Sequence, residues 1–166
     1  SPMVSVRGIS RERLQQAIDH ACADVPEELR PAVGLRNTRD TYVMVGRPQD
    51  NAAVRELLGK FAAKDTKAVE NKERGGEPFN PQFTDLPIQS AFHHPAMESA
   101  VEQTVAWAAK AGLDTAVARE AAQLVLTAQV DWPAELDAAV DAGARWILEI
   151  VPDGGMLPLT RRIVAG

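Results

Sequence analysis

Cysteine is almost absent from this sequence, because Cys22 is the only one among 166 residues. A single cysteine excludes an internal disulfide framework and a thiolate metal cluster, and it favours a reducing compartment such as the cytoplasm. Long apolar runs are also lacking, and none approaches the roughly 20 residues needed to cross a bilayer. The N-terminus has no basic patch followed by an apolar stretch, so no signal peptide is expected.

Positive charge is in short supply, with 18 lysines and arginines against 23 acidic residues and a net charge of -5. This balance disfavours nonspecific nucleic-acid binding, and we expect neither nucleic acid nor membrane as a partner. What is present suits a globular core, since 45% of the residues are hydrophobic and 25% are charged. The opening Ser1-Pro2-Met3 looks like a vector residue followed by an artificial start, which predicts an expressed piece of a larger protein.

The first half of the chain predicts the order strand, helix, strand, strand, helix, strand, which is the ferredoxin-like order. Alternating valines indicate the first strand, and Ser10 is placed to cap a helix whose apolar residues recur at helical spacing. The predicted elements are a strand at residues 4–7, a helix after Ser10, a hairpin of residues 32–35 and 41–45, a helix over residues 50–62, a long polar loop over residues 64–85 and a strand at residues 86–92.

The second half predicts helices rather than a sheet. Its expected elements are helices at residues 97–111 and 115–127, a third helix from Pro133 to Gly143, a strand at residues 146–151 and a short helix at residues 157–163. Together the two halves predict an α+β fold.

Only three histidines occur, and two of them, His93 and His94, are adjacent at the end of the predicted strand and before Pro95. A side chain at a strand end can project into a cleft while its backbone stays fixed, which suits a general base. Ordinary polar residues at a strand end are the alternative. Neighbours on a strand point to opposite faces and His20 is remote, so no metal site is expected. Cys22 is expected to be a small core residue.

The stretch at residues 86–97, Leu-Pro-Ile-Gln-Ser-Ala-Phe-His-His-Pro-Ala-Met, resembles the histidine motif of the malonyl/acetyl transferase family. In that family a strand leads to Pro-Phe-His-Ser, with a Met or Leu shortly after. The methionine spacing selects His93 as the counterpart of the family's catalytic histidine. Ala91 replaces the usual proline, and His94 replaces the usual serine.

Three further landmarks follow in the family's order, and the whole is most similar to the acetyl-transferase domain of microbial type I fatty acid synthase. They are a hairpin at residues 33–37 and 42–46, the approach to the histidine strand at residues 83–88, and a Val-x-Trp helix at residues 129–132 that leads to a closing strand at residues 143–150. The resemblance implies a ferredoxin-like small subdomain over residues 3–92 and the C-terminal part of the larger α/β subdomain over residues 93–166.

The resemblance also implies an activity, the transfer of an acyl group from a coenzyme A thioester to the phosphopantetheine thiol of acyl carrier protein. His93 would serve as catalytic base for a serine, with a backbone carbonyl fixing its tautomer. No bound cofactor is implied. The implied partners are the rest of the synthase chain and its acyl carrier protein domain, and the piece itself is expected to self-associate.

This sequence departs from the family in the nucleophile motif Gly-His-Ser-x-Gly, which it does not contain. We therefore expect the serine to lie outside it and the chain alone to be inactive. Val125 stands where some bacterial relatives carry a glutamine, and residues 151–153 replace a Gly-Pro-Gly. Two other readings stay open, namely the malonyl/palmitoyl transferase domain of the same synthase and a non-catalytic ferredoxin-like binding or scaffold module.

Overall fold

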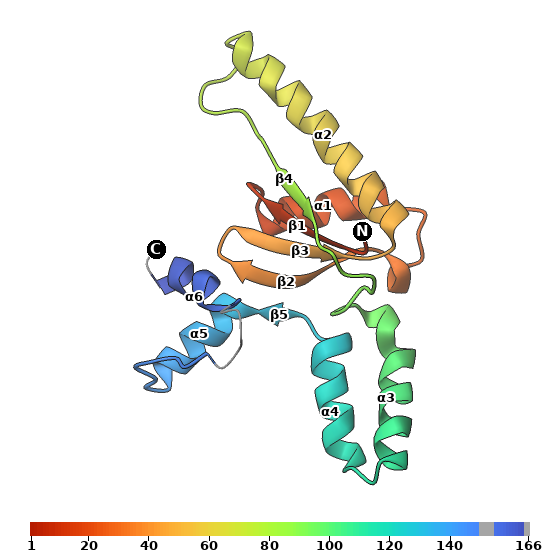
Figure 1. Cartoon of the computed structure of the whole chain (residues 1–166). Coiled ribbons are helices and arrows are strands. Elements are labelled where there is room, and N and C mark those ends of the chain that lie inside the picture. Colours follow the sequence, from red (N-terminus) through yellow and green to blue (C-terminus); the bar gives the residue numbers. More distant parts are fainter. Residues whose placement is uncertain (150–154, 165–166) are drawn as a thin grey trace.

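The computed structural model describes residues 1–149 and 155–164, and it places one small β-sheet at the centre of the molecule with groups of helices extending from it (Figure 1). The strands are β1 (Met3–Arg7), β2 (Ala32–Thr38), β3 (Thr41–Val45), β4 (Gln82–Asp85) and β5 (Val130–Asp131). The α-helices are α1 (Arg11–Ala21), α2 (Pro48–Glu70), α3 (Glu98–Lys110), α4 (Thr115–Leu126), α5 (Trp132–Asp141) and α6 (Leu157–Val164), and short 3-10 helices occupy η1 (Glu27–Leu29) and η2 (Pro95–Met97).

The sheet has the order β4-β1-β3-β2-β5. Its first four strands pair antiparallel with one another, and α1 and α2 connect them, so this part follows the order strand, helix, strand, strand, helix, strand. β5 adds a fifth strand that runs parallel to β2, pairing Leu35 with Val130 and Arg36 with Asp131. The sequence pattern did not predict β5, because two residues carry no periodicity.

Two apolar clusters lie on the two faces of the sheet. The larger one joins α1 and α2 to the sheet and consists of Val4, Val6, Ile9, Leu14, Ala17, Ile18, Cys22, Val33, Tyr42, Met44, Val54 and Leu58. The smaller one, on the alternate side chains of β1 and β3, is built from Met3, Val43 and Val45. Burial on both faces explains why β3 carries an unbroken run of large apolar or aromatic residues over positions 42–45 rather than an alternating pattern.

The predicted cap of the first helix agrees with the structure, but the second helix begins earlier and ends later than predicted. Ser10 accepts a hydrogen bond from the Arg13 amide at the start of α1, and Pro48 occupies the first turn of α2. α2 then continues to Glu70, eight residues past the predicted end at residue 62. Its last turns extend beyond the sheet and bury few side chains, so the apolar pattern that marks a helix fades there (Figure 1).

The predicted strand at residues 86–92 is wrong, because the fourth strand is β4, immediately before it. Leu86 extends the ladder by one bond to the Met3 carbonyl, and after it the backbone is irregular. Leu86, Ile88 and Phe92 pack instead against the smaller cluster. The segment is thus apolar because it covers the second face of the sheet, and this produced a strand-like pattern.

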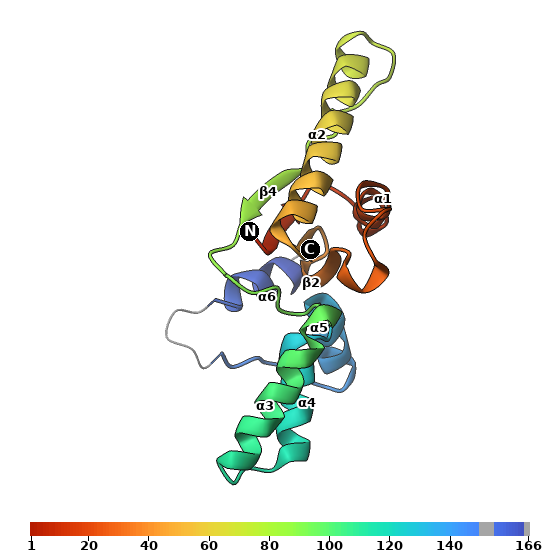
Figure 2. The ribbon, with the colours of Figure 1, turned by 90° about the vertical axis from the view of Figure 1, so that its right-hand side faces the viewer.

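The second half is mostly helical, as predicted. α3 and α4 pack against each other as an arm that extends from the sheet, and α5 and α6 form a separate group near β2 (Figures 1 and 2). The predicted strand at residues 146–151 is wrong over residues 146–149, which have no regular structure, and its last two residues lie outside the described ranges. A strand needs neighbours to pair with, and the described chain supplies none there. None of the helices in the described ranges is long and apolar enough to cross a membrane.

Candidate active site

His93 occupies a turn between the segment at residues 86–92 and η2, so it is not the end of a strand as predicted. Its backbone has a φ of 61°, in the left-handed region that residues with a Cβ rarely adopt. The side chain is half-buried, and its Nδ1 lies 3.0 Å from the carbonyl oxygen of Ala128, 35 residues further along the chain. A strained backbone of this kind is often found at functional sites.

The bond to Ala128 determines which ring nitrogen of His93 is available for chemistry. A carbonyl oxygen only accepts, so Nδ1 must carry the proton and donate it. In the neutral ring, Nε2 then keeps its lone pair and can accept a proton. The expected tautomer-fixing carbonyl is therefore present, and the structure identifies it as that of Ala128.

His94 has the opposite environment, because all its polar groups are occupied and its ring is only 3% exposed. Its Nε2 lies 2.7 Å from the Arg30 carbonyl oxygen, to which it donates, and its Nδ1 accepts from the Ala96 amide at 3.1 Å. The second bond caps η2. His94 is a structural residue that joins the η1 region to the start of the helical arm.

The carbonyl that faces His93 is delivered by the C-terminal end of α4. The Leu126 carbonyl accepts from the His94 amide at 3.0 Å, and the Ala128 amide donates to the Gln123 carbonyl at 2.9 Å. Two hydrogen bonds therefore hold the histidine turn to the end of α4. One is from the His94 amide to the Leu126 carbonyl, and the other is from the His93 ring to the Ala128 carbonyl. Because β5 begins two residues after Ala128, the same segment is also held by the sheet.

Sequence reasoning missed the residues that support the hydrogen bond between the His93 ring and the Ala128 carbonyl. β2 contributes Gly34, where an added Cβ would lie 3.1 Å from the His93 carbonyl oxygen and 2.8 Å from a Val45 methyl carbon. It also contributes Arg36, whose Nη1 lies 3.2 Å from Oδ2 of Asp131. Nothing in the sequence indicates these contacts. Every residue has a backbone carbonyl, so Ala128 does not stand out, and Arg36 and Asp131 are 95 positions apart in the chain.

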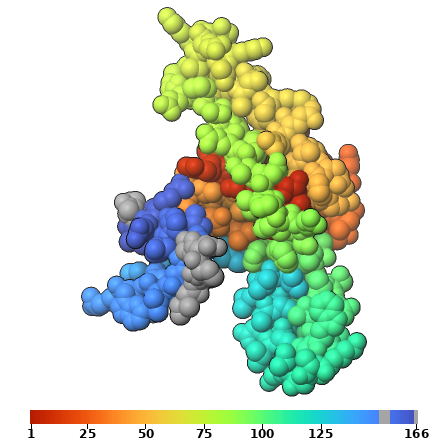
Figure 3. Space-filling view, viewed as in Figure 1, coloured from red at the N-terminus to blue at the C-terminus, as the bar shows by residue number. Residues whose placement is uncertain are grey.

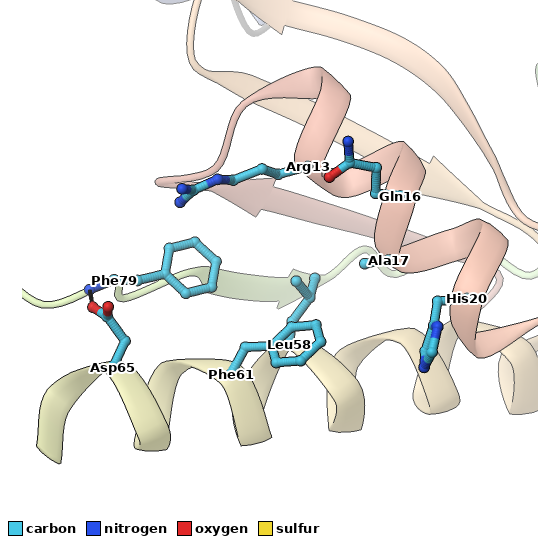
Figure 4. Close-up of a pocket in the computed structure, with 8 residues that line it drawn as sticks. All are labelled: Arg13, Gln16, Ala17, His20, Leu58, Phe61, Asp65 and Phe79. Atoms are coloured by element: carbon cyan, nitrogen blue, oxygen red, sulfur yellow. Dashed lines mark hydrogen bonds between the residues drawn. The ribbon is translucent and has the colours of Figure 1, made fainter. Parts of the chain in front are cut away.

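The other candidates of the sequence lie elsewhere. Cys22 is 2% exposed, and burial raises the pKa of its thiol, which disfavours the reactive thiolate. His20 is exposed and lines a pocket of about 430 Å³ between α1 and α2, with Arg13, Phe61, Asp65 and Phe79 (Figure 4). Neither His93 nor His94 lines that pocket. Within the described residues no group of three potential metal ligands comes together.

Comparison with solved structures defines the class of protein from the fold. MCAT of Streptococcus pneumoniae superposes with a TM-score of 0.66 at 16% identity, covering 97% of this chain and 51% of that one. A malonyl-CoA:acyl carrier protein transacylase of Xanthomonas oryzae gives 0.67 at 20% identity, covering 97% and 50%. The acyltransferase domain of the second salinomycin polyketide synthase module gives 0.63 at 19% identity, covering 99% and 37%. The chain thus has part of the acyltransferase fold, and it spans about half the length of the first two proteins and 37% of the third.

Sequence comparison then identifies the family. The family model of the fatty acid synthase central AT domain matches residues 2–85, just over half of the chain, and the chain belongs to this family. The fatty acid synthase beta subunit pkiC of Emericella nidulans is 30% identical over 100 residues. That match covers 60% of this chain and only 5% of the subunit. The likeness to a fatty acid synthase acyltransferase that the motifs suggested is therefore confirmed.

Proposed function

We propose that this chain forms the histidine-bearing part of an acyl-CoA:acyl carrier protein transferase in a type I fatty acid synthase, with His93 as the catalytic base. The observation that carries the proposal is the bond from His93 Nδ1 to the Ala128 carbonyl, which leaves Nε2 free to accept a proton. The Xanthomonas oryzae protein is named as a transacylase of acyl carrier protein, and the family match concerns a synthase acyltransferase, so both support the same reaction.

The proposed reaction has two half-steps that share one histidine. Nε2 of His93 removes the hydroxyl proton of a serine outside this sequence, and the serine oxygen attacks the thioester carbon of an acyl-coenzyme A. The carbon–sulfur bond breaks, the acyl group stays on the serine, and the leaving thiolate receives the proton from Nε2. The phosphopantetheine thiol of acyl carrier protein then loses its proton to Nε2, and its sulfur attacks the acyl-serine carbon. The carbon–oxygen bond breaks, the acyl group stays on the sulfur, and the serine oxygen receives the proton from Nε2.

We propose acetyl loading as the specific role, on the resemblance to the acetyl-transferase domain of microbial synthases. The sister malonyl/palmitoyl transferase domain remains the alternative. A malonyl group carries a carboxylate that a bidentate arginine would recognise, so the residues that surround the serine separate the two. The partners that this role requires are the rest of the synthase and the acyl carrier protein domain, and the setting is the cytoplasm.

The test compares histidine variants in the full-length synthase. His93→Ala is expected to reduce acyl loading from acetyl-coenzyme A by about 10²–10⁴-fold, the usual contribution of a positioned general base. His94→Ala is the matched control and should cost much less per folded molecule, because both ring nitrogens of His94 already bond to backbone groups.

A second measurement uses the 166-residue chain itself, which has no Gly-His-Ser-x-Gly. Labelled acetyl-coenzyme A should leave no covalent adduct on it.

In the full-length synthase, equal losses for the two histidine variants would contradict the assignment of His93, as would undiminished loading in His93→Ala. A stable adduct on the chain would contradict the external nucleophile.

A further inference from the structure

Strand β2 contacts the turn that carries His93 and also pairs with β5, the strand that begins two residues after Ala128. Gly34 lies so close to the His93 backbone that a Cβ would crowd its carbonyl oxygen. Two residues later, Arg36 pairs with Asp131 in the parallel ladder with β5. The turn that carries His93 and the segment that carries Ala128 are therefore both held next to β2, the first directly and the second through β5.

The link between β2 and β5 depends on a side-chain ion pair. β5 is only two residues long, so its ladder supplies few backbone hydrogen bonds. The Arg36 and Asp131 side chains are 31% and 33% exposed, so their ion pair is partly shielded from water. Asp131 uses its other oxygen to accept from the Ala134 amide at 3.0 Å, which caps α5. One carboxylate thus fixes both the strand and the helix that follows it.

Ala128 stands three residues before Asp131, between the end of α4 and β5. Three residues of chain span at most about 10 Å, so anchoring Asp131 limits where the Ala128 carbonyl can lie. The end of α4 also holds this segment, through the bond from the Ala128 amide to the Gln123 carbonyl. A shift of an ångström or so on loss of the second anchor is nevertheless enough to break a 3.0 Å hydrogen bond to His93.

We infer that Arg36 is a positioning residue, which holds the Ala128 carbonyl against His93 Nδ1 by binding Asp131. This inference rests on the proposed role of His93 as the base. Loss of Arg36 weakens the bond to Nδ1, so the ring populates the other tautomer, in which Nε2 carries the proton and cannot act as a base. The effect falls on catalysis rather than on substrate binding.

The primary experiment measures the tautomer of His93 in the 166-residue chain by ¹⁵N NMR of its ring nitrogens. The wild-type chain should show the Nδ1–H form as dominant. Arg36→Met should lower the ratio of the two tautomers about fivefold, the usual effect of losing one hydrogen bond. Asp131→Asn, which keeps an oxygen for the α5 cap, should give the same change, and the double variant should be no worse than either single one.

The matched control is Arg39→Met. Arg39 also joins the β2–β3 hairpin to α5, through Asp137 at 3.6 Å, but both side chains are more than half exposed. This variant should leave the His93 tautomer as in the wild type. If Arg36→Met fails to fold, Asp131→Asn decides. A wild-type tautomer ratio in a folded Arg36 or Asp131 variant overturns the inference, and so does an equal change in Arg39→Met.

A kinetic measurement separates this inference from the proposed function. In the full-length synthase, Arg36→Met should lower kcat for acetyl transfer by about 10-fold or more while KM for acetyl-coenzyme A stays the same. When the Ala128 carbonyl shifts by about an ångström, the His93 ring loses its support and the reacting nitrogen is misplaced. If the tautomer shifts but His93→Ala retains full transfer, the positioning role stands and the catalytic role fails. If His93→Ala abolishes transfer but the tautomer ratio and kcat of Arg36→Met are unchanged, the catalytic role of His93 stands and the positioning role of Arg36 fails.

Discussion

At the scale of single residues, the two adjacent histidines lie in different environments, because their backbones and partners differ. His93 has a left-handed backbone, and among the described residues only one of its ring nitrogens has a hydrogen-bond partner, whereas His94 is buried with both nitrogens bonded. The sequence motif distinguished the same two residues by spacing alone. Their environments lead to two predictions about stability that do not depend on any activity.

The first prediction concerns the strain at His93. His93→Gly should be more stable than His93→Ala by about 1 kcal/mol, because glycine adopts a positive φ without the clash of a Cβ. Urea unfolding of the chain measures the difference. Lys60, in the exposed middle of α2, supplies the control, since there the alanine variant should be the more stable by about 1 kcal/mol. An alanine at position 93 as stable as glycine would show that the turn is not strained.

The second prediction concerns His94. His94→Ala should destabilise the chain by about 2–4 kcal/mol, because it opens a cavity and leaves the Arg30 carbonyl and the Ala96 amide without their partner. His20→Ala is the control, and as an exposed residue it should change the free energy of unfolding by about 0.5 kcal/mol or less. Similar effects of the two substitutions would contradict the structural role of His94.

At the scale of elements, the extension of α2 beyond the sheet is held by a carboxylate. Asp65 accepts from the Arg74 guanidinium and, at 2.6 Å, from the Phe79 amide, so it ties the helix to the segment that leads back to β4 (Figure 4). The Arg74 hydrogen bond, and then the Phe79 bond, lower the pKa of Asp65 from 3.8 to about 2. This contact explains why residues predicted as loop continue a helix.

The third prediction is a pH dependence of this tie. A carboxyl with a lowered pKa stabilises the folded form above its ordinary pKa, and that stabilisation is lost as the pH falls from about 4 towards 2. The Phe79 amide should therefore lose protection from hydrogen exchange over this range, after correction for intrinsic rates, while amides of β1 and β3 keep theirs. Asp65→Asn cannot ionise, and its Phe79 amide should show no such transition. A transition that persists in Asp65→Asn would assign it to another group.

At the scale of the whole molecule, the two halves differ in how much apolar surface they leave exposed. Phe61 is the only large exposed hydrophobic residue of the first half among the described residues. The second half exposes Trp107, Leu113, Val117, Leu124, Val125, Val140, Trp146, Ile147, Leu148, Met156, Leu157 and Val164. The α3–α4 arm stands apart from the α5–α6 group in the space-filling view, so these faces lie open (Figure 3). Exposed faces of this kind favour self-association.

The fourth prediction follows from this contrast and from the proposed division at residue 92. Hydrogen exchange should be slowest in residues 3–92, where four strands and two helices pack on one another, and faster over residues 98–164. Protection of the second half should increase with protein concentration, since association covers its apolar faces. Uniform protection across both halves of a dilute monomer would show that the second half packs independently.

Periodicity and spacing in the sequence determined most of the elements, the ferredoxin-like order and the choice of His93. Helices with an apolar face, caps such as Ser10 and a short hairpin turn are specified locally, because each depends on residues within a few positions. The apolar pattern wrongly predicted a strand in two segments that are apolar without pairing in the sheet. Residues 86–92 cover a sheet face, and residues 146–149 are not paired with any strand of the described chain.

Only the tertiary structure decided what surrounds the histidine. The Ala128 carbonyl, the bare surface of Gly34 and the Arg36–Asp131 pair are brought to His93 by the parallel pairing of β2 with β5. A backbone carbonyl carries no signature in the residue that owns it, and an ion pair between residues 95 positions apart follows from no local pattern. The sequence could therefore single out His93 as a candidate, but the carbonyl that sets its tautomer became visible only when distant segments were placed side by side.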